Sequence, residues 1–187
     1  MAVERLKFID ESACHLGCHL GCHLGLTRLY GWAKHNEKCI GKVPGNTGKR
    51  QSVVGLFSLA GMESHKVETG SLSGASFCSF LETFVLPRLD AGDCLILDNA
   101  RCHRVKRVRE LVESVGAKLI YLPAYSPDYS PIELAWRGMK AFLRQTGART
   151  NEALQQAISD ALATVTPERA TEFFRHCGYE SQGRTAQ

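Results

Sequence analysis

Two acidic residues stand where they could form part of a metal site. The apolar run at 95–97 stops abruptly at Asp98, as a buried strand does when it brings a carboxylate to the edge of a sheet. Glu133 follows after 34 intervening residues, at the start of an expected helix. The interval holds an expected helix at about 103–115, an expected strand at 118–122 and a proline-rich loop. Two acids so placed can converge on one metal ion.

The helix that starts near Glu133 carries a row of cations. On a helix that advances about 100° per residue, Glu133 heads a ridge on one face. The ridge continues through Arg137, Lys140 and Arg144. A metal-binding acid at the edge of a DNA track requires such an arrangement. A structural alternative stays open, because Ser130 and Glu133 have the spacing of a capping box that merely closes the start of the helix.

The remaining elements complete an α/β pattern. Strands are expected at 6–10, 27–32, 52–60 and 65–68, and helices at 73–86, 150–164 and 167–177. Together with the elements around Asp98 and Glu133, this order is that of a ribonuclease-H-like fold, with a mixed five-stranded sheet and flanking helices. In that fold two acids lie on neighbouring strands and a third comes from a helix packed across them.

Composition limits the class of protein. The 187 residues suit one sizeable domain, and the net charge of +4 permits a polyanionic partner without demanding one. The N-terminus lacks the apolar core of a signal peptide, and no apolar run is long enough to span a bilayer. We therefore expect a cytoplasmic protein with no membrane contact, in which the eight cysteines remain thiols without disulfides.

The motifs around the two acids resemble the mariner-like superfamily of DDE transposases, in the branch carried by bacterial insertion sequences. The likeness rests on Asp98-Asn99-Ala100 with His103, and on the run LPAYSPDYSPIE at 122–133, in which Ser130 replaces a commoner Asn. It extends from FIDE at 8–11 to HCGY at 176–179.

The resemblance implies a site and a reaction. It makes Asp10 the first catalytic acid, whereas sequence position alone equally allows a strand-end aspartate that starts a turn. Asp10, Asp98 and Glu133 would hold two Mg²⁺ ions, or Mn²⁺ as a substitute, about 4 Å apart. The expected reaction is hydrolysis at transposon ends, followed by transfer of the freed 3′-hydroxyl into target DNA at a TA step. The expected DNA contacts are Asn99, His103, Arg137, Lys140 and Arg144. For His103 a purely structural role is equally open.

The resemblance also implies an organisation and partners. Residues 1–180 would form the catalytic domain and 181–187 a frayed tail. The helix-turn-helix region that reads transposon ends is expected to be absent and to be supplied by a half encoded upstream. A homodimer is expected on DNA, because two ends must be joined. The alternative is a catalytically inactive remnant, or a fragment that only binds DNA or dimerises.

A tandem repeat lies close to Asp10. The unit Cys-His-Leu-Gly at 14–17 recurs at 18–21 and 22–25, and relatives have one unit at most, so part of 14–25 is interpreted as an insertion. Cysteine and histidine could bind zinc. Glycine at every fourth position weakens any helix that would align these ligands, so a duplication that lengthens a surface hairpin is favoured.

Overall fold

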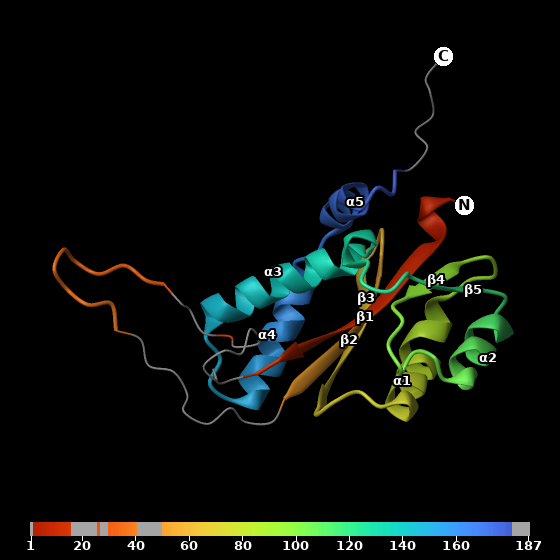
Figure 1. Ribbon diagram of the computed structural model, residues 1–187, viewed down its shortest axis with the longest axis horizontal. Helices are drawn as coiled ribbons and strands as arrows, with labels where there is room; N and C mark the ends of the chain where they lie inside the picture. Colours follow the sequence, from red (N-terminus) through yellow and green to blue (C-terminus); the bar gives the residue numbers. More distant parts are fainter. Residues whose placement is uncertain (1, 16–25, 27–29, 41–49, 181–187) are drawn as a thin grey trace, which may run out of the picture.

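A mixed five-stranded sheet forms the centre of the molecule, as the computed structural model shows for residues 2–15, 26, 30–40 and 50–180 (Figure 1). Its strands are β1 (Leu6–Cys14), β2 (Gln51–Ser58), β3 (Gly61–Thr69), β4 (Cys94–Leu97) and β5 (Lys118–Tyr121). They lie in the order β3-β2-β1-β4-β5. The β1–β2 and β2–β3 pairs are antiparallel, whereas β4 runs parallel to both β1 and β5. The predicted fold class is confirmed.

Helices cover both faces of this sheet (Figure 1). They are α1 (Gly74–Phe80), α2 (Lys106–Ser114), α3 (Pro131–Thr146), α4 (Asn151–Ala163) and α5 (Pro167–His176). Alternation along β1 decides which face each side chain meets. Phe8 packs into the core beneath α3, α4 and α5, and Ile9 packs into the core beneath α1 and α2. Asp10, two residues after Phe8, therefore belongs to the face that α3 crosses.

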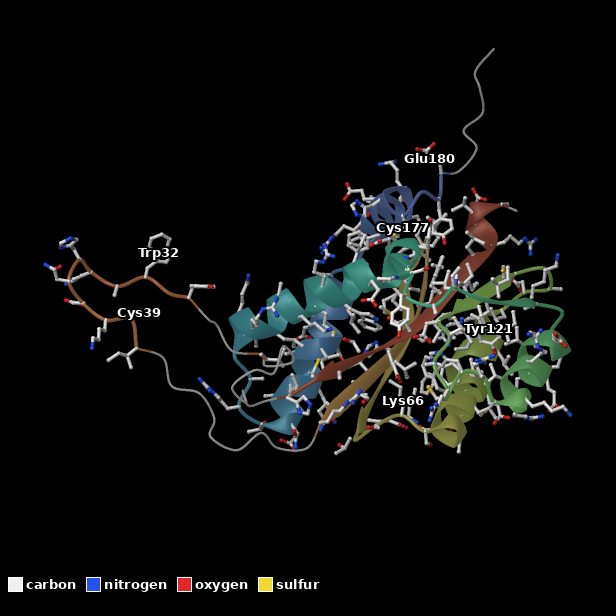
Figure 2. The ribbon with its side chains drawn as sticks, in the orientation of Figure 1. Trp32, Cys39, Lys66, Tyr121, Cys177 and Glu180 are labelled. Atoms are coloured by element: carbon white, nitrogen blue, oxygen red, sulfur yellow. The ribbon has the colours of Figure 1, made fainter. Side chains whose placement is uncertain are left out.

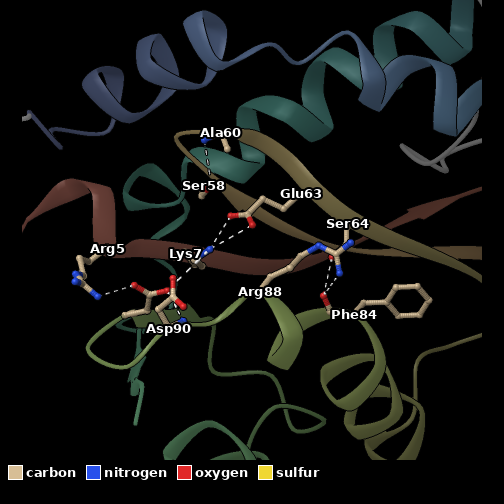
Figure 3. A network of polar contacts seen from close by, with 10 residues as sticks. Arg5, Lys7, Ser58, Ala60, Glu63, Ser64, Phe84, Arg88 and Asp90 are labelled. Carbon is tan, nitrogen blue, oxygen red and sulfur yellow. Dashed lines mark hydrogen bonds and ion pairs between the residues drawn. The ribbon is translucent and has the colours of Figure 1, made fainter. Parts of the chain in front are cut away.

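A polar network fixes the N-terminal end of β1 (Figure 3). The Lys7 ammonium donates to both carboxylate oxygens of Glu63 on β3, at 3.0 and 3.2 Å. It also lies 4.0 Å from the carboxylate of Asp93, which ends the turn before β4. Arg5 donates to the Ala91 carbonyl at 2.9 Å. These contacts bind β1 to elements on both sides and so fix the strand that carries Asp10.

Two predicted elements differ in the structure. The helix expected from about residue 103 begins only at Lys106, because Val105 has extended backbone angles and the Tyr121 hydroxyl donates to the His103 carbonyl at 2.9 Å. Of the strand expected at 27–32, residues 27–29 lie outside the described part, and 30–32 are irregular and exposed. Trp32 lies on that segment, away from the sheet (Figure 2).

The tail at 181–187 and residues 16–25 of the repeat also lie outside the described part. Cys14 ends β1 as a buried residue. The six cysteines that the structure describes are free thiols. In the same residues no helix has the length and apolarity needed to cross a bilayer.

Candidate active site

Two neighbouring strands bring Asp10 and Asp98 together. Ile9 of β1 pairs with Leu97 of β4, and the two strands are parallel. The residue that follows each member of this pair is therefore an aspartate at the same level of the sheet. Asp10 is buried, with 8% of its surface exposed, whereas the side chain of Asp98 is half-exposed. The sheet thus presents two adjacent carboxylates in unlike surroundings.

Glu133, in the first turn of α3, joins the two aspartates in lining one cavity of about 350 Å³. The capping-box alternative does not hold, because the Ser130 side chain makes no cap hydrogen bond. In a capping box the Ser130 amide would donate to the glutamate side chain. Here it donates instead to the Pro127 carbonyl at 2.9 Å. The start of α3 is thus formed without the Glu133 carboxylate, which stays on the exposed surface of the cavity.

Trp136 holds Asp10 from the next turn of α3. Its indole Nε1 donates to Asp10 Oδ2 at 3.0 Å inside the core. Burial first, and the Glu133 and Asp98 carboxylates after it, raise the pKa of Asp10 to about 7, although the Glu11 backbone and the indole act in the opposite direction. One oxygen of Asp10 is therefore fixed by the helix.

Gly55 makes room for that indole. It faces Asp10 across the β1–β2 ladder. A Cβ at this position would lie 2.9 Å from the Trp136 ring and 2.8 Å from the Met62 sulfur. In the sequence Trp136 shows only the helical spacing of a core residue, and neither it nor Gly55 carries a signal for a partner so distant along the chain.

His103 holds Asp98 from the opposite face. Its Nδ1 lies 2.5 Å from Asp98 Oδ1, which also accepts the Ala100 amide at 2.9 Å. The histidine bond, followed by that amide, outweighs partial burial and lowers the pKa of Asp98. The His103 ring has no exposed surface and packs on Phe77 with ring centres 4.4 Å apart. Of the two roles left open for His103, this geometry favours the structural one, positioning Asp98, over direct contact with DNA.

The cavity fits a divalent cation by its donor chemistry. Three carboxylates line it, and carboxylate oxygen is the ligand that Mg²⁺ prefers. The raised pKa of Asp10 reflects in part the repulsion among these acids, which a cation would relieve. In the described ranges no three His, Cys, Asp or Glu side chains already form a group able to hold a metal ion. The fit therefore rests on the donor set and the shared cavity.

A second cavity, lined by both cations and carboxylates, adjoins the acids. Arg137 and Lys140 line this cavity of about 440 Å³, which shares Pro127, Ser130 and Glu133 with the first. Among the residues with described positions, neither cation forms an ion pair. Arg144 is half-buried further along α3. The ridge can therefore meet a polyanion without breaking existing pairs.

The basic face of α2 and the side chain of Asn99 contribute differently. On α2, Lys106 pairs with Glu110 at 3.3 Å and Arg109 with Glu113 at 3.1 Å, as expected of an ordinary solvated helix face. Asn99 lines the acid cavity and donates to the Leu122 carbonyl at 2.8 Å. The amide thus fixes the loop after β4 against the loop after β5.

One acid from β1, one that follows β4 and one from α3 thus line a single cavity, and the family comparison gives the class of the protein: an endonuclease domain. Residues 5–155 match the family described as DDE superfamily endonuclease, and the chain belongs to that family. The predicted family resemblance is thereby confirmed at this level, whereas the bacterial insertion-sequence branch stays a prediction.

Solved structures of Mos1 transposase are similar in fold. The Mos1 strand transfer complex is 16% identical, with a TM-score of 0.71 over 94% of this chain and 51% of that one. The Mos1 paired-end complex with Mn has a TM-score of 0.72, and the catalytic domain with raltegravir and Mn has one of 0.65 over 77% of its length. The chain spans about half the length of the Mos1 chains in the two complexes. No curated protein matches it.

Proposed function

We propose that this chain is the catalytic domain of a DNA transposase. It hydrolyses phosphodiester bonds at transposon ends and transfers the 3′-hydroxyl into target DNA. One observation carries the proposal: Asp10, Asp98 and Glu133 line a single cavity, next to a second cavity that Arg137 and Lys140 line. The Mos1 structures of similar fold include complexes with Mn and with Mg, which supports a divalent cofactor.

The residues have distinct roles in this mechanism. Asp10, Asp98 and Glu133 would hold two Mg²⁺ ions, or Mn²⁺ in their place, which when bound activate the attacking oxygen and stabilise the leaving one. Trp136 orients Asp10, and His103 keeps Asp98 ionised. The ridge of Arg137, Lys140 and Arg144 would bind the DNA backbone, and Asn99 would contact the strand at the cavity wall.

The partners are part of the proposal. Transposon ends and target DNA are the substrates, and a homodimer would bring two ends together. A helix-turn-helix half encoded upstream would read the ends, as in an insertion sequence, and insertion would occur at TA steps. We place this activity in the cytoplasm, where the described free cysteines would remain reduced.

A second candidate is an inactive remnant that binds DNA or dimerises without turnover. The observation that favours it is the lack, among described side chains, of a ready-made group of three metal ligands. The two candidates differ in one measurable property, which is metal-dependent cutting.

The test compares wild type with Asp98→Ala on DNA that carries transposon ends, in Mg²⁺ or Mn²⁺. We expect metal-dependent nicking by wild type and its loss in Asp98→Ala, with Asp160→Asn, an exposed acid on α4, as the matched control. Equal nicking by wild type and Asp98→Ala would refute the assignment of the site. DNA binding without nicking by any of these proteins would favour the inactive fragment.

A further inference from the structure

Tyr125 has an unusual backbone and a fully exposed ring. Its φ is +59°, and Asn36 is the only other non-glycine residue with positive φ in the described ranges. Such a conformation is uncommon for a bulky side chain and costs about 1 kcal/mol or more. Tyr125 is 102% exposed, so burial of the ring does not offset this cost. The strain therefore has no explanation in packing.

The position of Tyr125 relates this residue to the acids. It lines the cavity of about 350 Å³ that Asp10, Asp98 and Glu133 also line. Other large apolar side chains are exposed in the described part, but none of them lines this cavity. Tyr30 and Trp32, the other two that are almost fully exposed, belong to the segment at 30–40. Figure 2 shows Trp32 there, away from the sheet.

We propose that Tyr125 is a stacking platform for the nucleobase next to the phosphodiester at the three acids. This inference rests on the proposed function and adds a substrate contact to it. A tyrosine ring can stack on the face of any base, and base–aromatic stacking is worth about 1–3 kcal/mol. The ring holds the base at the cavity mouth, and the adjoining phosphate then lies within the cavity that the carboxylates line.

The loop around Tyr125 suits this role. The residue stands between β5, which ends at Tyr121, and the turn Pro127–Tyr129 that leads into α3. The loop is tied at both ends, because Asn99 donates to the Leu122 carbonyl and the Ser130 amide donates to the Pro127 carbonyl. A ring on a braced loop loses less entropy on stacking than one on a free loop.

The test measures stacking directly. A pre-cleaved DNA end carries 2-aminopurine as its 3′-terminal base, since the fluorescence of this analogue falls when it stacks. Binding is followed by anisotropy with Mg²⁺ present. We expect quenching by wild type, by Tyr125→Phe and by the control Tyr30→Ala. Tyr125→Gly should lose most of the quenching and bind the DNA roughly tenfold more weakly.

Glycine also separates this role from a structural one. Gly adopts positive φ without strain, so Tyr125→Gly should unfold no more easily than wild type while losing the stacking signal. Quenching that persists in Tyr125→Gly bound to the DNA would overturn the inference and leave the proposed function intact. Failure of wild type to bind the DNA at all would instead overturn both.

Discussion

Asp10 within β1 and Asp98 just after β4 lie at the same level of two neighbouring parallel strands, yet their surroundings move their pKa values in opposite directions. Asp10 is buried near Glu133, and its pKa is raised to about 7. Asp98 is half-exposed and accepts a bond from His103, and its pKa is lowered. The backbone therefore places both acids alike, and the side chains around them set their charge.

The difference has a consequence for metal binding. At neutral pH Asp98 is already an ionised ligand, whereas a large share of Asp10 must lose a proton when a cation binds. The cavity thus combines one ligand that is ready with one that the cation itself must ionise. This asymmetry predicts which substitution costs more, and at which pH.

The largest expected effect follows from removing the ready ligand. Asp98→Asn should weaken Mn²⁺ binding more than about 100-fold. Losing a residue that only hydrogen-bonds to a metal ligand already costs about 10–100-fold, and losing the ligand itself should cost more. At pH 6, where Asp10 is mostly protonated, Asp10→Asn should cost clearly less than Asp98→Asn, and the two should converge near pH 8. Calorimetric titration with Mn²⁺ at both values checks this, with Asp160→Asn as the control. Equal losses for both variants at pH 6 would remove the asymmetry.

The next effect is on stability in the absence of metal. Asp10 has a folded pKa near 7 against an ordinary value of 3.8, so the folded state holds a proton that the unfolded state releases. Stability from this proton is full below about pH 4 and is lost as the pH rises through 7, an effect on the order of 4 kcal/mol. Denaturant unfolding in EDTA should show the unfolding free energy of wild type falling, relative to that of Asp10→Asn, between pH 4.5 and 8.

Asp98→Asn provides the contrast with the opposite sign. The lowered pKa of Asp98 stabilises the fold above its ordinary pKa, and that contribution is lost as the pH falls through the folded value. The stability difference between wild type and Asp98→Asn should therefore shrink toward low pH. Parallel pH profiles for the two asparagine variants would contradict the comparison.

The sequence predicted which acids meet at one cavity better than it predicted the surroundings of those acids. Asp98 and Glu133 are visible as the end of an apolar run and the head of a helix, whereas Asp10 needed the family motif. The capping box failed because the Ser130 amide is already bonded to Pro127. Such competition between backbone partners depends on the fold of the loop, which spacing alone does not reveal.

The sequence did not reveal the hydrogen-bond partners of the two aspartates, for a related reason. The role of His103 depended on where α2 begins, and the extended Val105 moves that start beyond the histidine. Trp136 has the helical spacing of a core residue, and its burial agrees with that pattern. Its bond to Asp10 joins residues far apart in sequence, so only the packed structure brings donor and acceptor together.

A smaller effect tests the bond between His103 and Asp98. His103→Ala removes the donor and should weaken Mn²⁺ binding about tenfold, while His103→Asn, which can place an amide N–H near the position of Nδ1, should recover most of the affinity. Calorimetric titration gives both values. If His103 served only packing, both variants would lose stability. The folded fraction of each would then bind Mn²⁺ as tightly as wild type.

The smallest effect concerns the indole that holds Asp10. Trp136→Phe keeps an aromatic ring but removes a donor to a carboxylate, which should cost a few-fold in Mn²⁺ affinity and about 1–2 kcal/mol in stability. Gly55→Ala should act through the same ring, because its Cβ would lie 2.9 Å from the Trp136 ring and would displace it. If so, the double variant should bind Mn²⁺ no more weakly than Trp136→Phe alone. Additive losses of affinity would show that Gly55 supports Asp10 by a route that does not pass through the indole.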